Sequence, residues 1–194
     1  MIMDMKDVIT TARALAMDEI SRYGTPKAEH FEISFRAGQR LAELLQADRN
    51  IVALGTILMD LKIGECLQEG KIEEHVARSA AVSREFLAPL GLPVETVAKI
   101  ISCVESHHGR EKYDCPEAEI CANADCYRFL TPAGIFNYLI LLGQRSQDGA
   151  AALDQLEYKV EEKHNALSLE ICKKELEPYY LQFKDLLAKA RQGI

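Results

Sequence analysis

The fold of this 194-residue chain is decided by the stretch Asn50-Ile-Val-Ala-Leu-Gly-Thr-Ile-Leu-Met-Asp60-Leu-Lys-Ile-Gly64. From Ile51 to Met59 there is no charge, and apolar or small side chains fall on every side of a helix. A helix that is apolar all round is a buried helix. Asp60 follows directly, and a carboxylate removed from water needs a compensating partner. The stretch therefore predicts a central helix that ends at a buried carboxylate whose partners lie elsewhere in the chain.

Helical periodicity continues on both sides of this stretch, and strand-type alternation and internal repeats are absent from the sequence. The pattern predicts further helices over residues 4–22, 26–47, 72–87, 97–108, 117–130, 132–142, 150–163 and 168–191. We therefore expect an all-α fold with the whole chain, residues 1–194, in a single domain. The last two helices carry nothing that suggests chemistry, and we expect them to complete the packing or to form the face of a homodimer.

Short polar segments separate the expected helices. Thr25-Pro26 and Thr131-Pro132 each place an N-cap residue before a proline at the first helical position. Asn50 is the expected cap of the central helix, and residues 65–71 read as a looser polar segment between two glycines.

The composition limits the partners of the chain. A net charge of -7 disfavours duplex nucleic acid and anionic membranes, although a local basic pocket can still hold a phosphate. The first residues lack the apolar core of a signal peptide, and no apolar run approaches the ~20 residues of a membrane span. We expect a soluble cytoplasmic protein whose six cysteines are mostly buried thiols rather than disulfides.

Six ionisable side chains fall on or beside apolar helix faces: His30, Asp60, His75, His107, His108 and Asp125. A single histidine in such a place is usually a core residue that is hydrogen-bonded to a backbone carbonyl. Four histidines and two carboxylates together form the ligand set of zinc, iron and manganese. These residues therefore predict a buried metal site.

The adjacent pair His107-His108 allows two interpretations. Neighbouring helical positions point about 100° apart, so such a pair does not normally converge on one ion. At a helix end before Gly109 the backbone can turn and let both rings reach one centre. Alternatively, one ring points inward and the other faces solvent, where it complements the negative end of the helix dipole.

The order of these residues resembles that of the HD-domain metal-dependent phosphohydrolase superfamily, in its branch with a His-His pair and two metal ions. The matching segments are Glu29-His30-Phe31, Leu58-Met59-Asp60 and residues 74–80, 105–109 and 123–130. The resemblance covers about residues 25–140. It implies an HD-like helical bundle over that range, followed by a C-terminal helical extension over about 148–194.

The resemblance implies two half-sites for divalent ions (Fe, Mn, Zn or Ni) that share the bridging carboxylate of Asp60. The first half-site would use His30, Asp60, Asp125 and a histidine immediately before Asp60, where this chain has Met59. A thioether is a poor ligand for these ions, so we expect the first half-site to be partly degenerate. The ligands of the second half-site are all present: Asp60, His75, His107 and His108.

The chemistry that the resemblance implies is hydrolysis of a small nucleotide or phosphomonoester. The best-placed cations for its phosphate are Lys62 and Arg128, which we group with Asp60 as the catalytic residues; Arg78, Arg110 and Lys112 are further candidates. Family members often have a lysine three residues after the aspartate, where this chain has Ile63. Two alternatives stay open: a non-catalytic regulatory domain that binds a metal or a nucleotide, and a diiron oxygenase.

Overall fold

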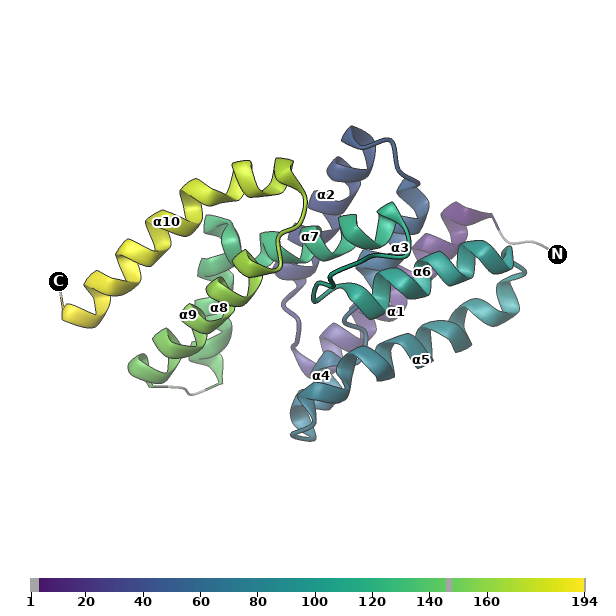
Figure 1. Cartoon of the computed structure of the whole chain (residues 1–194). Helices are drawn as coiled ribbons and strands as arrows, with labels where there is room; N and C mark the ends of the chain where they lie inside the picture. The colour runs from purple at the N-terminus through teal and green to yellow at the C-terminus, as the bar shows by residue number, and fades with distance from the viewer. Residues whose placement is uncertain (1–3, 146–147, 194) are drawn as a thin grey trace.

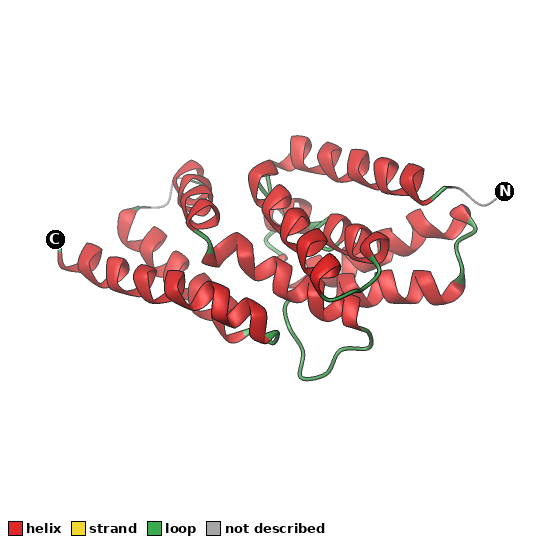
Figure 2. Ribbon diagram, turned by 90° about the horizontal axis from the view of Figure 1, so that it is seen from above, coloured by secondary structure: helices red, strands yellow, loops and turns green. Residues whose placement is uncertain are grey.

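The computed structural model describes residues 4–145 and 148–193, and every secondary-structure element in these ranges is helical (Figure 2). The prediction of an all-α fold is therefore confirmed. The α-helices are α1 (Met5–Tyr23), α2 (Ala28–Leu44), α3 (Arg49–Leu58), α4 (Ile63–Gln68), α5 (His75–Leu87), α6 (Val94–Ser106), α7 (Pro116–Leu130), α8 (Pro132–Gln144), α9 (Gly149–Asn165) and α10 (Glu170–Gln192). Two short 3₁₀ helices, η1 (Ile72–Glu74) and η2 (Ala88–Leu90), flank α5.

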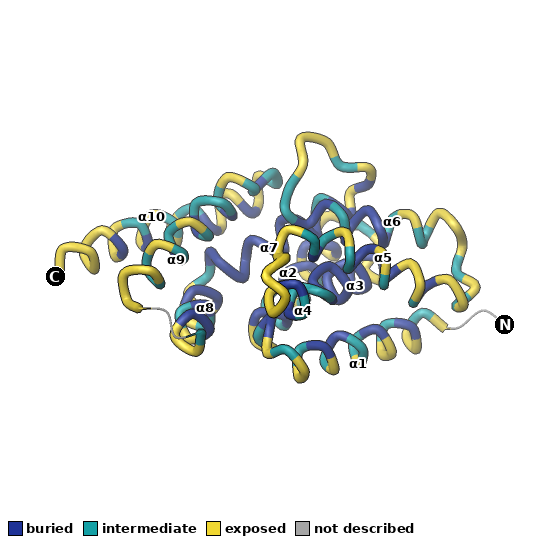
Figure 3. The backbone as a smooth tube through the Cα atoms, turned by 90° about the horizontal axis from the view of Figure 1, so that it is seen from below, coloured by how far each residue is buried: buried dark blue, intermediate teal, exposed yellow. Residues whose placement is uncertain are grey.

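Helices α3 and α7 form the centre of the molecule, as their burial shows (Figure 3). Every residue of α3 from Ile51 to Leu58 is buried, and α1, α2, α6 and α7 pack around it. Residues 120–130 of α7 are also all buried. The uncharged stretch thus forms the central helix that its composition predicts, and Asp60 follows it immediately.

Gly55 lets α3 approach α6 and α7 closely. A Cβ atom at this position would lie 2.5 Å from Cβ of Cys103 and 2.7 Å from Sγ of Cys121. We expect Gly55→Ala to lower the free energy of unfolding by about 1–3 kcal/mol, since an overfilled core forces its neighbours apart. Gly143→Ala is the matched control, because nothing lies within 4 Å of its added Cβ. Urea denaturation of both variants measures the difference, and equal stabilities would refute the close approach.

The helix starts differ from two of the expected caps. Asp48, not Asn50, caps α3, and its carboxylate accepts hydrogen bonds from the backbone N–H groups of Asn50 and Ile51. The Thr25–Pro26 peptide is cis and α2 begins only at Ala28, so the expected cap at Thr25 is wrong. The cap at Thr131 is confirmed, because its hydroxyl accepts a hydrogen bond from the N–H of Gly134.

Residues 63–68 are also helical, although the glycines around them suggested a looser segment. Gly64 lies against Tyr23 and Thr25, where an added Cβ would come within 2.5 Å of Cβ of Tyr23. A larger residue would therefore clash with the end of α1, and this close contact fixes the position of α4 against α1.

Helices α9 and α10 form an antiparallel pair at one end of the molecule (Figure 1). Helix α9 packs on α7 and α8, and α10 packs on α9 and α7. The pair thus packs against the remainder through α7 and α8. All six cysteines are buried and none forms a disulfide. Within the described ranges, no helix is both long and apolar enough to cross a membrane.

Candidate metal centre

Asp60 lies at the centre of the candidate site and is 7% exposed. Its Oδ2 is 2.6 Å from Nη1 of Arg128. Its Oδ1 faces the other way, 3.3 Å from Nε2 of His107 and 3.7 Å from Nε2 of His75. The two oxygens of this carboxylate therefore serve different neighbours, an arginine on one side and imidazoles on the other.

Three histidines from two helices meet beside Asp60. His75 is the first residue of α5, His107 follows the last residue of α6, and His108 comes next in the chain. Nε2 of His75 lies 3.0 Å from Nε2 of His108. One nitrogen of each ring lies within 4.8 Å of the others, which is close enough for one metal ion. The structure thus brings both members of the His-His pair to one centre, at a helix end where Gly109 has a φ of 95°.

Backbone carbonyls fix the tautomers of two of these rings. Nδ1 of His75 donates to the carbonyl of Ile72 at 2.6 Å, and Nδ1 of His107 donates to that of Val104 at 2.7 Å. A carbonyl only accepts, so in the neutral rings Nε2 carries the lone pair. Metal-binding histidines are oriented in the same way by a hydrogen bond from their other nitrogen.

The ring of His108 can adopt either tautomer. Its Nδ1 lies 3.3 Å from Oε1 of Glu162, an acceptor, and 3.1 Å from Nζ of Lys163, a donor. When Nδ1–H donates to Glu162, Nε2 presents its lone pair to the two other histidines. Glu162 and Lys163 both belong to α9, so the C-terminal helices orient a ring of the site.

Electrostatics favour a cation at this centre. Burial lowers the pKa of His75 and lowers that of His108 to about 4, so both rings are neutral at pH 7. Oδ1 of Asp60 and Nε2 of His107 are buried and make no hydrogen bond. When Nδ1–H of His108 donates to Glu162, acceptor atoms face one another at about 3 Å, and a shared divalent ion would remove their repulsion. The residues of the second half-site therefore fit a metal ion.

The carboxylates of the first half-site form ion pairs with two basic side chains instead. Arg128 donates through Nη2 to Oδ1 of Asp125 while its Nη1 contacts Asp60. Nζ of Lys163 lies 2.7 Å from Oδ2 of Asp125. Met59 is buried beside them. The first half-site, as this chain builds it, does not fit a metal ion.

The two carboxylates and the two basic side chains keep one another ionised in the interior. Burial alone would raise the pKa of both carboxyls, but the guanidinium of Arg128 lowers the pKa of Asp60 and of Asp125 well below the ordinary range. Burial would likewise lower the pKa of Arg128 and Lys163, and the carboxylates raise it. All four groups are therefore charged at neutral pH, as two pairs of opposite sign.

His30 lies near these carboxylates but points its Nε2 elsewhere. Nε2–H donates to the carbonyl of Gly134 at 2.8 Å, and the ring packs against Phe129 and Tyr138. Burial lowers the pKa of His30 to about 4. The hydrogen bond leaves the lone pair on Nδ1 in the neutral ring, and the ring also lines the pocket described next.

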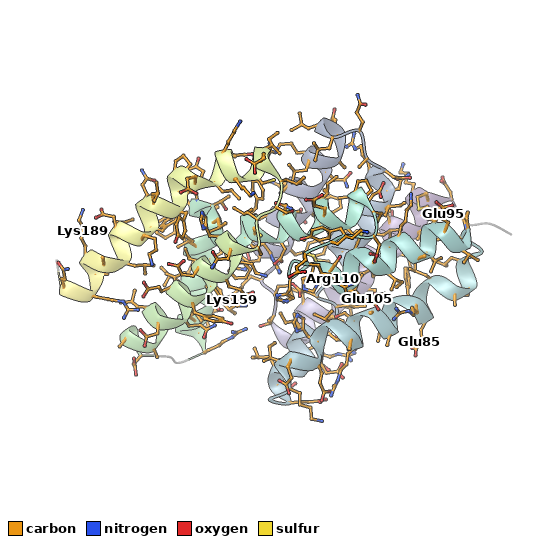
Figure 4. All side chains as sticks on the ribbon, viewed as in Figure 1. Glu85, Glu95, Glu105, Arg110, Lys159 and Lys189 are labelled. Carbon is orange, nitrogen blue, oxygen red and sulfur yellow. The ribbon has the colours of Figure 1, made fainter. Side chains whose placement is uncertain are left out.

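A pocket of about 300 Å³ opens beside the histidines and Asp60. Its apolar wall consists of Ile63, Leu67, Ile72, Phe129, Tyr138 and Leu141, and its basic residues are Arg128, Arg145, Lys159 and Lys163. Figure 4 labels Lys159 on α9. The pocket thus joins the candidate metal centre to both an apolar surface and several cations, which suits a ligand with a phosphate and an apolar part.

Of the five cations that the sequence suggested for a phosphate, only Arg128 lines this pocket. Nζ of Lys62 lies 3.2 Å from Glu19 and 2.8 Å from Glu65, so its charge is already compensated. Arg78 is paired with Glu69 and Glu74 in the same way. The remaining two are Arg110, whose side chain donates to the carbonyl of Glu105, and the exposed Lys112.

Sequence reasoning missed the contribution of α9 to the site. Lys163 is 1% exposed although it is a lysine in a helix with a polar sequence. One signal could have revealed it, because Lys163 continues the buried stripe of Leu156 and Val160 and precedes the buried Leu167 by one turn. A charged residue on an apolar stripe needs a partner of opposite charge, as Asp125 proves to be.

The comparisons with known proteins concern the fold. The sequence matches no protein-family model and no curated protein. A predicted HD superfamily hydrolase from an uncultured Thermotogales bacterium matches with a TM-score of 0.61 and 14% identity, over 97% of this chain and 91% of its own. YpgQ of Bacillus subtilis matches with a TM-score of 0.70 and 14% identity, over 99% and 98%. Its complex with ADP matches with a TM-score of 0.71 and 14% identity, over 99% and 97%. The chain therefore has the fold of an HD superfamily hydrolase.

Proposed function

We propose that this chain is a metal-dependent phosphohydrolase that acts on a small nucleotide or phosphomonoester. The observation that carries the proposal is the convergence of three imidazoles beside a buried carboxylate: Oδ1 of Asp60 faces Nε2 of His107 and of His75, and Nε2 of His75 lies 3.0 Å from Nε2 of His108. Imidazole and carboxylate suit iron, manganese, zinc and nickel alike. The same four residues would hold the ion.

A divalent ion at this centre would lower the pKa of a bound water and polarise a phosphoryl oxygen. The residues of the chain prepare the centre for it. The carbonyls of Ile72 and Val104 hold two imidazoles in the required tautomer. Arg128 keeps Asp60 ionised and turns its free Oδ1 toward the histidines. Arg128 also lines the pocket, but Asp60 and Asp125 engage its Nη1 and Nη2, so its role is to position Asp60.

A nucleotide suits the pocket better than a simple phosphomonoester. Its aromatic residues Phe129 and Tyr138 suit a planar base, and Arg145, which has no carboxylate partner among the described residues, offers charge for a phosphate. YpgQ, which shares this fold, crystallised in complex with ADP. These two observations together support a nucleoside phosphate as the ligand.

Arg145 is the cation with the clearest role in such binding. Among the described residues it has no carboxylate partner, and its Nη2 donates only to the hydroxyl of Thr25 at 3.0 Å. We expect Arg145→Gln to weaken ADP binding about tenfold, since a hydrogen bond to a charged phosphate contributes about 1.4 kcal/mol. Isothermal titration calorimetry with ADP gives the dissociation constant.

Two controls accompany this measurement. Arg36→Gln removes a charge whose side chain is 80% exposed and which lies outside the pocket, so ADP affinity should stay unchanged. Adenosine tests the origin of the loss, because it has no phosphate. An equal loss of affinity for adenosine and ADP in Arg145→Gln would contradict the role of Arg145 as a phosphate ligand.

The proposed function is tested by metal analysis of protein purified without added ions, followed by a screen against phosphate compounds. The screen is run with and without manganese. Metal-dependent release of phosphate or pyrophosphate from a nucleotide is the expected result. Bound metal without turnover of any phosphate compound would overturn the proposal, as would a protein that cannot be loaded with metal.

A second candidate function is a non-catalytic domain that binds a metal or a nucleotide for regulation. The observation in its favour is the pairing of Arg128 with Asp60 and Asp125, which removes two carboxylates from one half-site. Saturable ADP binding without turnover would select it. A diiron oxygenase needs two adjacent ions and gains no support from this arrangement. A homodimer stays a prediction that light scattering can test.

A further inference from the structure

We infer that the guanidinium of Arg128, together with the ammonium of Lys163, takes the place of a metal ion, so that the chain binds one ion and not two. The inference rests on the proposed function only for the ion that remains, at the three histidines. It concerns the other side of Asp60, where two carboxylates and two basic side chains form a closed group.

The position of Arg128 is the first observation. Its Nη1 lies 2.6 Å from Oδ2 of Asp60, and its Nη2 donates to Oδ1 of Asp125. One planar cation thereby bridges the two carboxylates that a first ion would share. Its side chain is 5% exposed, so water screens little of its charge. A divalent ion between the same oxygens would have to displace the guanidinium or lie against it.

The charge balance is the second observation. Lys163 contacts the remaining oxygen of Asp125 at 2.7 Å and is itself 1% exposed. Asp60 and Asp125 thus carry two negative charges, and Arg128 and Lys163 carry two positive charges. These four charges cancel without a metal ion, and Glu162, which lies 3.1 Å from Lys163, is itself paired with Lys159 at 2.7 Å. A buried cluster that is already neutral gains no charge compensation from a further dication.

The surroundings are the third observation. Met59 is 1% exposed and offers a thioether, and His30 has its Nε2 bonded to the carbonyl of Gly134. The nitrogen ligand that position 59 would have to supply beside Asp60 is therefore missing, because a thioether is a poor ligand for these ions.

The result is an aspartate that bridges two unlike cations. Oδ2 of Asp60 serves a permanent guanidinium, and Oδ1 faces the histidines at which an exchangeable ion would bind. Arg128 is in this sense a positioning residue, which holds Asp60 in place from the side opposite the ion. Its spacing three residues after Asp125 on α7 puts both side chains on one helix face.

The number of bound ions tests the inference. Protein stripped with a chelator is titrated with Mn²⁺ by calorimetry, and bound manganese is counted by elemental analysis after desalting. We expect one ion per wild-type chain. Met59→His alone should leave the count unchanged, because Arg128 still occupies the carboxylates. The double variant Met59→His/Arg128→Ala should bind one ion more than the wild type.

Electron paramagnetic resonance of the manganese-loaded proteins provides an independent signature. An isolated Mn²⁺ ion gives a six-line spectrum, whereas two ions bridged by a carboxylate give an exchange-coupled spectrum. We expect the first in the wild type and the second in the double variant. If the alanine variant does not fold, Met59→His/Arg128→Gln replaces it, since glutamine retains polarity and most of the volume without the charge.

The outcomes separate this inference from the proposed function. Two ions in the wild type, or two in Met59→His alone, overturn the inference and leave the proposed function standing. A folded double variant that gains no ion also overturns it. A wild type without metal overturns the metal site of the proposed function, whereas an additional ion in the double variant would still support the replacement by Arg128.

Discussion

Asp60→Asn is expected to reduce metal content to background and to lower any phosphohydrolase activity at least ~100-fold. Its Oδ1 is the one carboxylate oxygen that faces His75 and His107. The amide keeps the shape of the side chain but replaces an anionic oxygen ligand with a neutral and weaker one. Changes that only disturb the orientation of metal ligands already cost about 10–100-fold in affinity, so loss of a charged ligand should cost more. Elemental analysis and a Mn²⁺ titration measure the effect.

The matched control for this change is Asp18→Asn. The side chain of Asp18 is 69% exposed and lies 3.8 Å from Arg22, so the substitution removes a carboxylate charge without touching the site. Metal content and activity should equal those of the wild type. Full metal content in Asp60→Asn would show that the three histidines bind the ion without Asp60, and the ligand assignment would then be wrong.

Lys163→Met is expected to lower the free energy of unfolding by about 3 kcal/mol, because it leaves one oxygen of a buried carboxylate unpaired. Asp125 is fully buried, and Lys163 is the partner of its Oδ2. The loss would be a large share of the total, since domains are stable by about 5–15 kcal/mol. Urea denaturation at pH 7 measures it through helical circular dichroism.

Lys159→Met is the matched control on the same helix, four residues earlier. Its ammonium pairs with Glu162 at 2.7 Å, in a partly exposed position. Exposed pairs of this kind contribute at most about 1 kcal/mol, so this variant should unfold close to the wild type. Equal stabilities of the two methionine variants would contradict the ion pair between α9 and the buried carboxylate.

The unfolding of Lys163→Met also tests whether the chain forms a single domain. The resemblance implied a core over residues 25–140 with a separate extension. Lys163 and Glu162 of α9 contact Asp125 and His108 in the interior. A single unfolding transition that shifts as a whole in Lys163→Met would support one domain over the full chain. Separate transitions would instead support an autonomous core.

The sequence by itself determined the fold class and the central helix, and it predicted one group of candidate ligands. The uncharged run before Asp60 leaves α3 without a polar face for solvent. Helix α3 therefore had to be buried, whichever helices packed against it. Histidines on or beside apolar stripes could be predicted to form one site, with the orientation of the His107-His108 pair left open. The structure places one nitrogen each of His75, His107 and His108 within 4.8 Å of the others.

Only the tertiary structure decided what compensates the carboxylates on the other side. Helical periodicity predicts the face of the helix on which a residue lies. It does not predict which helix packs against that face, or how the two helices are shifted along their axes. Arg128 could have pointed to solvent, and Lys163 lies 38 residues beyond Asp125 in a helix that looked purely structural. Their contacts depend on how α7 and α9 pack together. The charge balance of this site depends on which side chains are close enough to pair across the interface between α7 and α9. The order of residues does not give those distances.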